Sequence, residues 1–185
     1  MKWYKLNIND MSESEYNKFF DLMSEEKREK VKRLKKDRDK KLSVCGEMLA
    51  KRAISELTGK NAEEIVFEIK KSGKPFCQNA DIEFSISHSG EYVVCAVSTH
   101  RVGIDIQIVT PYNDKTAKKV CSEEEIKKIE ESSDKAREFI KIWTKKEAVL
   151  KRDEKSIFSS DIKTCLLDEN IKTIEFKDYF VSIAD

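Results

Sequence analysis

FSISHSGEYVVCAVSTHRVGIDIQ, residues 84–107, is the stretch from which the fold is best predicted. Its apolar runs predict two strands that turn at Gly90, and a third strand follows over 102–108. Two features do not suit ordinary strands. Ser-His-Ser-Gly contains His88, one of two histidines in the chain, and Asp105 interrupts Gly-Ile-Asp-Ile where an apolar residue or Thr is usual. These polar side chains suggest chemistry as well as structure.

The elements expected around this stretch follow one order twice: strand, helices, strands. Strands are expected at 3–8, 65–69, 84–87, 92–98, 102–108, 164–167, 174–176 and 179–183. Helices are expected at 24–36, 39–57 (ended by Gly59), from the capping box Ser122-x-x-Glu125 onward, and at 134–152. We therefore predict an α+β fold of two similar halves, residues 1–100 and 101–185, in one compact unit.

The composition narrows the class of protein. The chain has 185 residues, of which 39% are hydrophobic, which is enough for a core and argues against disorder. Its 36 basic and 35 acidic residues nearly cancel, so net charge indicates no partner. The five cysteines are scattered without C-x-x-C, which argues against a disulfide framework or zinc knuckle. With no signal-peptide pattern and no apolar run of about 18 residues, we expect a cytoplasmic protein that does not span a membrane.

A basic run, KREKVKRLKKDRDKK, covers residues 27–41 and holds ten basic and three acidic residues. One interpretation is a solvated helix face. The other is a surface for phosphates or for an acidic protein. Nucleic acid is less favoured, because the run has no interleaved aromatic residues and no recognisable reading motif.

Two further groups of residues could carry chemistry. Ser87, His88 and Ser89, together with Gly90, resemble a loop that presents hydroxyl, imidazole and N–H groups to an anion. On the next strand Asp105 and Gln107 share one face, opposite an apolar face of isoleucines. That face is either an ordinary half-exposed strand surface or a site for a hard cation such as Mg²⁺.

The helix expected at 134–152 carries an apolar stripe that includes Phe139, Trp143 and Leu150. Lys146 falls within this stripe and could extend its ammonium group to solvent. Glu147 falls at its edge, and there are two interpretations. It forms an ordinary surface ion pair with Lys151, or, partly wrapped by apolar neighbours, it acts as a metal ligand or proton acceptor.

These motifs in this order resemble a known family. They are Gly73-Lys74-Pro75, Phe84-Ser85-Ile86-Ser87-His88-Ser89-Gly90, Val102-Gly103-Ile104-Asp105-Ile106 and Trp143-x-x-Lys146-Glu147-Ala148-x-x-Lys151. The chain is similar to the 4'-phosphopantetheinyl transferases of the surfactin-synthetase-activating type. No single motif is specific, but four spaced motifs in one order over residues 73–151 are unlikely to agree by chance.

The resemblance implies a Mg²⁺-dependent enzyme. It transfers the 4'-phosphopantetheine arm of coenzyme A to a serine of an apo acyl or peptidyl carrier protein and releases adenosine 3',5'-bisphosphate. The implied fold has two similar halves, each a small, mostly antiparallel sheet packed against helices, related by a pseudo-twofold axis. Coenzyme A lies in the cleft between them. Carrier proteins are usually acidic, so part of residues 27–41 could dock one. We expect a monomer with no nucleic-acid partner.

The resemblance also implies roles for individual residues. Asp105, Gln107 and Glu147 correspond to the metal ligands, Glu147 also to the group that activates the serine hydroxyl, and Lys151 to a lysine beside the pyrophosphate. The implied contacts to coenzyme A are the adenine segment (Lys74, Pro75), the phosphate contacts (Ser87, His88), the 3'-phosphate lysine (Lys40 or Lys41) and looser phosphate candidates (Lys32, Arg33, Lys36).

Two departures from the family pattern leave an alternative open. Many relatives have glutamate where this chain has Gln107, which supplies an amide oxygen but no charge. The glycines that often follow the Lys151 position are replaced by 152–157, Arg-Asp-Glu-Lys-Ser-Ile. A homologue that binds coenzyme A and carrier protein but turns over weakly is one alternative. A basic nucleic-acid module is a less favoured one.

Overall fold

The computed structural model describes residues 1–164, 166 and 171–185. The first half of the chain contains β1 (Lys2–Asn7), η1 (Ile8–Asp10), α1 (Glu13–Asp21), α2 (Glu25–Lys32), α3 (Asp37–Thr58), η2 (Ala62–Glu64), β2 (Phe67–Ile69), β3 (Pro75–Cys77), β4 (Glu83–Ser89) and β5 (Tyr92–Ser98). The second contains β6 (Gly103–Ile108), α4 (Asp114–Val120), α5 (Glu123–Glu131), α6 (Lys135–Arg152), η3 (Ser160–Lys163), β7 (Lys172–Glu175) and β8 (Tyr179–Ala184).

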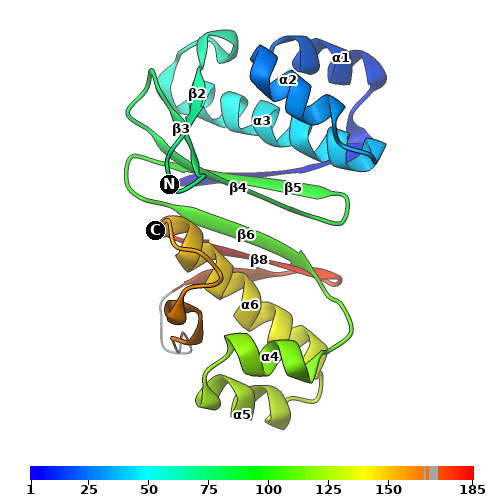
Figure 1. Ribbon diagram of the computed structural model, residues 1–185, viewed down its shortest axis with the longest axis vertical. Coiled ribbons are helices and arrows are strands. Elements are labelled where there is room, and N and C mark those ends of the chain that lie inside the picture. Colours follow the sequence, from blue (N-terminus) through cyan, green and yellow to red (C-terminus); the bar gives the residue numbers. More distant parts are fainter. Residues whose placement is uncertain (165, 167–170) are drawn as a thin grey trace.

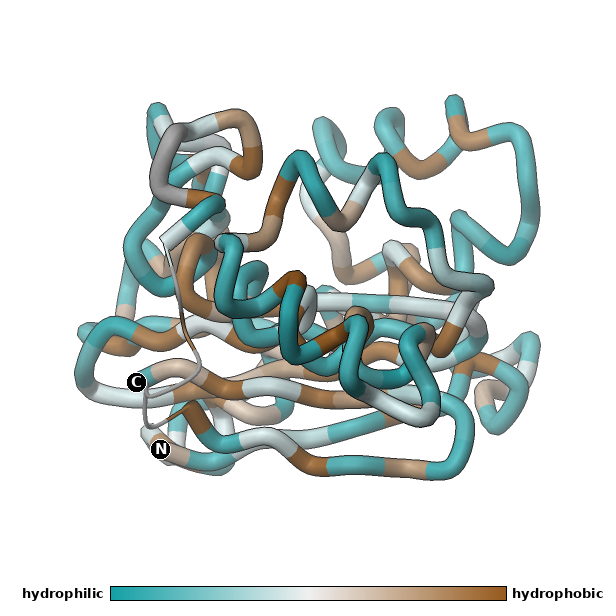
Figure 2. Tube along the Cα trace, turned by 90° about the horizontal axis from the view of Figure 1, so that it is seen from below, coloured by the Kyte–Doolittle hydropathy of each residue, from teal (hydrophilic) through white to brown (hydrophobic). Residues whose placement is uncertain are grey.

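These elements stack in layers of helices, sheet, sheet and helices (Figure 1). Helices α1–α3 cover the outer side of one sheet, and α6 with α4 and α5 lies beyond the other. The hydrophobic positions in Figure 2 gather along the central strands, whereas the outer helical turns are mostly hydrophilic. The two sheets therefore pack against each other at the centre of the molecule. A site between the halves would lie along the interface between these sheets.

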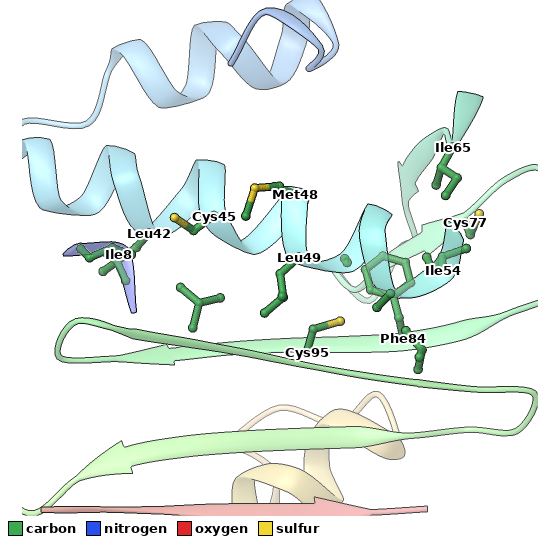
Figure 3. Packing of buried hydrophobic residues seen from close by; sticks show 14 of the residues in the cluster. Ile8, Leu42, Cys45, Met48, Leu49, Ile54, Ile65, Cys77, Phe84 and Cys95 are labelled. Carbon is green, nitrogen blue, oxygen red and sulfur yellow. The ribbon is translucent and has the colours of Figure 1, made fainter. Parts of the chain in front are cut away.

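The first sheet has the strand order β1-β5-β4 and is antiparallel throughout. Its central strand β5 is a continuous apolar run because it is buried on both faces: Cys95 packs toward α3, and Val94 packs toward the second sheet. In Figure 3, Leu49 points from α3 toward Cys95 of β5, and Phe84 of β4 lies beside Ile54 of α3. The strand β4 alternates instead, with Phe84 on the α3 side and serines on the other.

The second sheet has the order β6-β8-β7, also antiparallel, and pairs Asp105 with Ser182. The isoleucines of β6, among them Ile104 and Ile106, join Val181 in the core between the sheets. Asp105 and Gln107 therefore lie on the opposite face of β6 from these isoleucines, as the strand period predicts. The helix α6 packs on both β6 and β8.

Gly103 brings α6 into close contact with β6. A Cβ atom at this position would lie 1.9 Å from the Ala148 carbonyl oxygen and 2.5 Å from the Arg152 nitrogen. Both are backbone atoms of α6, so neither can move without moving the helix. Glycine is required here by the approach of two backbones, and that approach sets Glu147 and Lys151 of α6 beside Asp105 of β6.

The predicted α+β fold of two halves with small antiparallel sheets is confirmed. Helix α3 ends at Gly59, whose φ is 75°, as expected. The sequence patterns did not predict α1, α4 or β3, which are short elements of 9, 7 and 3 residues. The strand expected at 164–167 falls partly outside the described residues. Among those residues, no helix is long and apolar enough to cross a membrane.

Replacing Gly103 with alanine is expected to destabilise the protein by about 3 kcal/mol or more, because α6 would be forced off β6. That corresponds to a Tm lower by roughly 6–12 °C for a chain of this size. The matched control is Gly46→Ala in α3, where the new methyl group would contact side chains alone, Ile86 at 3.3 Å and Val93 at 3.8 Å. Thermal unfolding followed by circular dichroism measures both. A Gly103→Ala loss no larger than that of Gly46→Ala would contradict the close-approach argument.

Candidate functional site

Three serines on one face of β4 contact the free edge of β6. The Ser85 hydroxyl accepts from the Ile104 N–H at 3.2 Å, and the Ser89 hydroxyl accepts from the Ile108 N–H at 3.0 Å. Between them, Ser87 does not bind the strand backbone. The alternation in Phe-Ser-Ile-Ser-His-Ser therefore has a structural role. It places serine hydroxyl groups on the side of β4 where the first sheet contacts an edge strand of the second.

The carboxylate of Asp105 is buried at this junction, with 4% of the residue exposed. Its Oδ1 atom accepts from the Ser87 hydroxyl at 2.6 Å and from the Lys151 ammonium at 2.6 Å. Its Oδ2 atom is buried and, among the described residues, has no hydrogen-bond partner. A buried carboxylate oxygen without a partner is costly, and such an atom needs a functional explanation.

Glu147, half-buried on α6, is the second acid of the site. Burial raises the pKa of its carboxyl above the ordinary value, the nearby charge of Asp105 raises it further, and Lys151 opposes the rise. Asp105 and Glu147 are close enough to repel each other when both are ionised, and one of them has a buried oxygen without a partner among the described residues. The doubly ionised state is therefore disfavoured unless a cation lies between the two carboxylates. The surface-pair interpretation of Glu147 is therefore incomplete, because Lys151 makes its ion pair with Asp105.

These donors fit Mg²⁺ better than a metal that needs a complete protein cage. No cluster of three or more His, Cys, Asp or Glu side chains suited to a metal exists in the described part of the chain. Mg²⁺ usually takes one or two carboxylates and completes its octahedron with waters and substrate phosphates. Asp105 Oδ2 and the Glu147 carboxylate supply two oxygens, and Gln107 follows on the same strand face with an amide oxygen.

Lys146, next to Glu147, is not solvated as the snorkelling interpretation suggested. It is 2% exposed and pairs at 2.8 Å with Glu125, which is fully buried. Its ammonium group also donates to the carbonyls of Ile162 and Thr164, at 2.8 Å each. Glu125 in turn accepts from the backbone N–H of Leu166. The pair joins α5, α6 and the segment after α6, and so fixes the helix that carries Glu147.

The Gly73-Lys74-Pro75 segment lies between β2 and the start of β3. Lys74 is largely buried, with 11% of its side chain exposed, and its ammonium contacts Glu83 at 3.3 Å and the Val102 carbonyl at 3.2 Å. This places Lys74 against the connection between the halves. Its contact with a ligand, like that of Pro75, stays a prediction.

His88 is exposed on β4, and the charged groups around it affect the pKa of its imidazole. Desolvation by the surrounding protein and the cation of Lys151 lower its pKa, whereas Asp39 and Asp105 oppose the shift. A neutral imidazole beside Lys151 can still donate one hydrogen bond to an anion. The predicted phosphate contacts of His88 and Ser87 stay predictions, and Ser87 is at present engaged with Asp105.

The basic run 27–41 is partly neutralised by its own acids. Lys40 pairs with Asp37, and two lysines of α2 pair with α2 glutamates. Arg38 donates to the Gly90 carbonyl, at 2.6 Å from one of its terminal nitrogens, and pairs with a neighbouring glutamate, so it ties the start of α3 to the β4–β5 turn. Lys40 and Lys41 stay candidates for a phosphate contact.

Several residues that build the site were not found from the sequence. They are Ser85, which holds β6; Arg38, which holds the turn; Glu125, the partner of Lys146; and Glu154, which contacts the β2–β3 loop. Ser89 was expected to face an anion, and its bond to the Ile108 N–H was not predicted. The serine alternation was the one usable signal. The others depend on contacts between residues that are far apart in the sequence, and no local pattern predicts such contacts.

Comparisons with known proteins agree on one family. Residues 10–100 match the family described as 4'-phosphopantetheinyl transferase, N-terminal, and residues 101–181 match the 4'-phosphopantetheinyl transferase superfamily. The chain is 31% identical over 172 residues to 4'-phosphopantetheinyl transferase gsp of Aneurinibacillus migulanus, covering 91% of this chain and 72% of that protein. It is 30% identical over 161 residues to 4'-phosphopantetheinyl transferase Sfp of Bacillus subtilis, covering 85% and 72% respectively.

Replacing Lys146 with methionine is expected to cost about 3–5 kcal/mol, because it leaves the Glu125 charge buried without a partner. The corresponding fall in Tm is roughly 6–20 °C. Lys145→Met is the matched control, since Lys145 is half-buried and makes no such pair in the described part of the chain. Equal melting temperatures for the two variants would show that the buried pair does not hold α6.

Replacing Glu147 with glutamine is expected to stabilise the metal-free protein at pH 7. The raised pKa of Glu147 means that its ionised form is disfavoured in the folded state. Stability is therefore lost as pH rises from the ordinary glutamate pKa through the folded value, and glutamine removes this loss. We expect a higher Tm than that of the wild type at pH 7 and no difference near pH 4. A gain that persists at pH 4, or no gain at pH 7, would contradict the assigned cause.

Proposed function

Because this chain belongs to the 4'-phosphopantetheinyl transferase family, we propose that it transfers the 4'-phosphopantetheine arm of coenzyme A to a serine of an apo acyl or peptidyl carrier protein. Adenosine 3',5'-bisphosphate is the second product. The observation that carries the proposal for this site is the buried Oδ2 atom of Asp105, which lacks a partner in the described structure and lies near the disfavoured charge of Glu147. A divalent cation satisfies both.

Asp105 and Glu147 would hold Mg²⁺, with Gln107 as a neutral third ligand, directly or through water. When bound, the ion neutralises the diphosphate of coenzyme A and the charge that develops on it during transfer. Asp105 is preset for this role because Ser87 and Lys151 occupy its Oδ1 atom and leave Oδ2 free. Since Gln107 adds no charge, the protein contributes two negative charges to the site.

Glu147 and Lys151 would assist the transfer itself. The serine hydroxyl of the carrier protein attacks the phosphorus that bears the pantetheine arm, and Glu147 takes the hydroxyl proton, directly or through a water. The new serine–phosphorus bond forms as the bond to the adenosine bisphosphate oxygen breaks. Lys151, next to Asp105, neutralises the leaving phosphate.

The remaining coenzyme A contacts would come from the N-terminal half. Lys74 and Pro75 would border the adenine, Ser87 and His88 the phosphates, and Lys40 or Lys41 the 3'-phosphate. We propose that residues 1–100 and 101–185 act as two lobes with coenzyme A between them.

The carrier protein would dock against basic residues of 27–41, including the looser phosphate candidates Lys32, Arg33 and Lys36, because carrier proteins are usually acidic. We further propose a monomer that binds neither nucleic acid nor membrane and works in the reducing cytoplasm. The buried free thiols of Cys45, Cys77, Cys95 and Cys121 support the reducing compartment.

Gln107 favours a second candidate function. With an amide where many relatives have a carboxylate, the metal could bind weakly, and the chain would then bind coenzyme A and a carrier protein with little turnover. The two candidates differ in whether product forms, so one assay separates them.

The test is a mass-shift assay on apo acyl and peptidyl carrier domains with coenzyme A and Mg²⁺. The carrier is expected to gain one phosphopantetheine, and Asp105→Ala or Glu147→Ala is expected to lower the rate by about 100-fold or more, a loss of roughly 3 kcal/mol of transition-state stabilisation. Asp153→Asn is the control acid, because Asp153 pairs with its neighbour Arg152.

Two outcomes would contradict this account. Coenzyme A binding without a mass gain on any carrier would favour the weak homologue. Full activity of both alanine variants would remove Asp105 and Glu147 from the mechanism.

A further inference from the structure

The helix α6 ends in a conformation that normally needs glycine. Glu154 has φ of 57° and is, among the described residues, the one non-glycine with a positive φ. The Lys155 N–H donates to the Leu150 carbonyl at 2.9 Å, which is the bond that closes a Schellman cap around a left-handed residue. A glutamate in this position is strained relative to glycine, and such strain persists only where other contacts hold it.

Both carboxylate oxygens of Glu154 are engaged by the other half of the protein. Oε1 pairs with Lys70 at 2.6 Å, and Oε2 accepts from the Ser72 hydroxyl at 3.1 Å. These partners lie 84 and 82 residues earlier in the chain. The contact with Lys70 holds the pKa of Glu154 below its usual range, and Ser72 adds to this. The side chain that glycine lacks is therefore the part of Glu154 that bridges the halves.

The bridged loop is the one that leads into Lys74. Within it, the Lys70 N–H donates to the Lys74 carbonyl at 2.9 Å, and the Gly73 N–H donates to the Lys70 carbonyl at 2.9 Å. Lys70 and Lys74 also share Glu83, each at 3.3 Å from one of its oxygens. The loop is thus a closed turn with one charged network, and Glu154 attaches that network to α6.

We propose that Glu154 is a positioning residue for the nucleotide end of coenzyme A, an inference that rests on the proposed function. We define Glu154, Lys70 and Ser72 as the clamp. Glu147 and Lys151 stand on α6, and Glu154 belongs to the cap that follows this helix. The clamp therefore fixes the distance between the residues proposed to lie at the diphosphate and the Lys74-Pro75 segment. It makes no contact with the reacting atoms. Its effect therefore falls on coenzyme A affinity and leaves the chemical step unchanged.

The experiment compares coenzyme A binding by calorimetry for wild type, Glu154→Gln, Glu154→Gly, Lys70→Met and the double variant Glu154→Gln/Lys70→Met. The control is Asp153→Asn, which removes the adjacent carboxylate without touching the loop. Glu154→Gln keeps the side-chain length, and Glu154→Gly removes the backbone strain, so at least one variant retains the fold. Transfer assays on the same proteins give kcat and KM for coenzyme A.

Each clamp variant is expected to raise Kd and KM roughly three- to tenfold with kcat within about twofold of wild type, and the control is expected to change none of them. The loss of affinity in the double variant is expected to be clearly smaller than the sum of the two single losses, because both single variants already lose the Lys70–Glu154 contact. Three results would contradict the proposed role of the clamp: losses of affinity that add up in the double variant, an unchanged Kd in the single variants, or a fall in kcat without a change in Kd. If wild type binds coenzyme A and Glu154→Gln binds it equally, the clamp fails and the proposed function stands. If wild type does not bind it, both fail.

Discussion

The carboxylate of Asp105 is the interaction on which the rest of the site depends. It receives Ser87 from the first sheet and Lys151 from α6, both at 2.6 Å on one oxygen. One buried group thus joins a strand of the N-terminal half to a helix of the C-terminal half. Its other oxygen is buried without a hydrogen-bond partner among the described residues, and the proposed cation would satisfy it and would also lower the raised pKa of Glu147. The same carboxylate that joins the halves is therefore the one that we propose as a metal ligand.

Such a site needs a helix held rigidly against a strand. Gly103 permits the close approach of β6 and α6, and the buried Lys146–Glu125 pair anchors the middle of α6 to α5 and to the segment after it. Just after α6, Glu154 has a strained backbone conformation, and its side chain contacts the loop before Lys74. In the sequence Lys146-Glu147, the first residue forms a buried structural ion pair with Glu125, and the second lies near Asp105 and is proposed to act in the site.

The sequence predicted the fold and the faces on which Asp105 and Glu147 lie, but not the contacts that support them. Strand periodicity placed Asp105 opposite the isoleucines of β6, and helical periodicity placed Glu147 at the edge of an apolar stripe. Short elements such as α4 have too few residues for a periodic signal. The role of Lys146 was misread, because a lysine in an apolar stripe looks the same whether it reaches solvent or a buried glutamate. Glu154 looked like a missing glycine, and its partner Lys70 lies 84 residues away.

The most direct measurement is a crystal structure of the protein with coenzyme A and Mn²⁺, which takes the same oxygen ligands as Mg²⁺ and can be located by its anomalous signal. The account predicts one peak bonded to Asp105 Oδ2, to the Glu147 carboxylate and to oxygens of the diphosphate. A metal bound elsewhere, or a diphosphate seated without a metal between these two carboxylates, would contradict it.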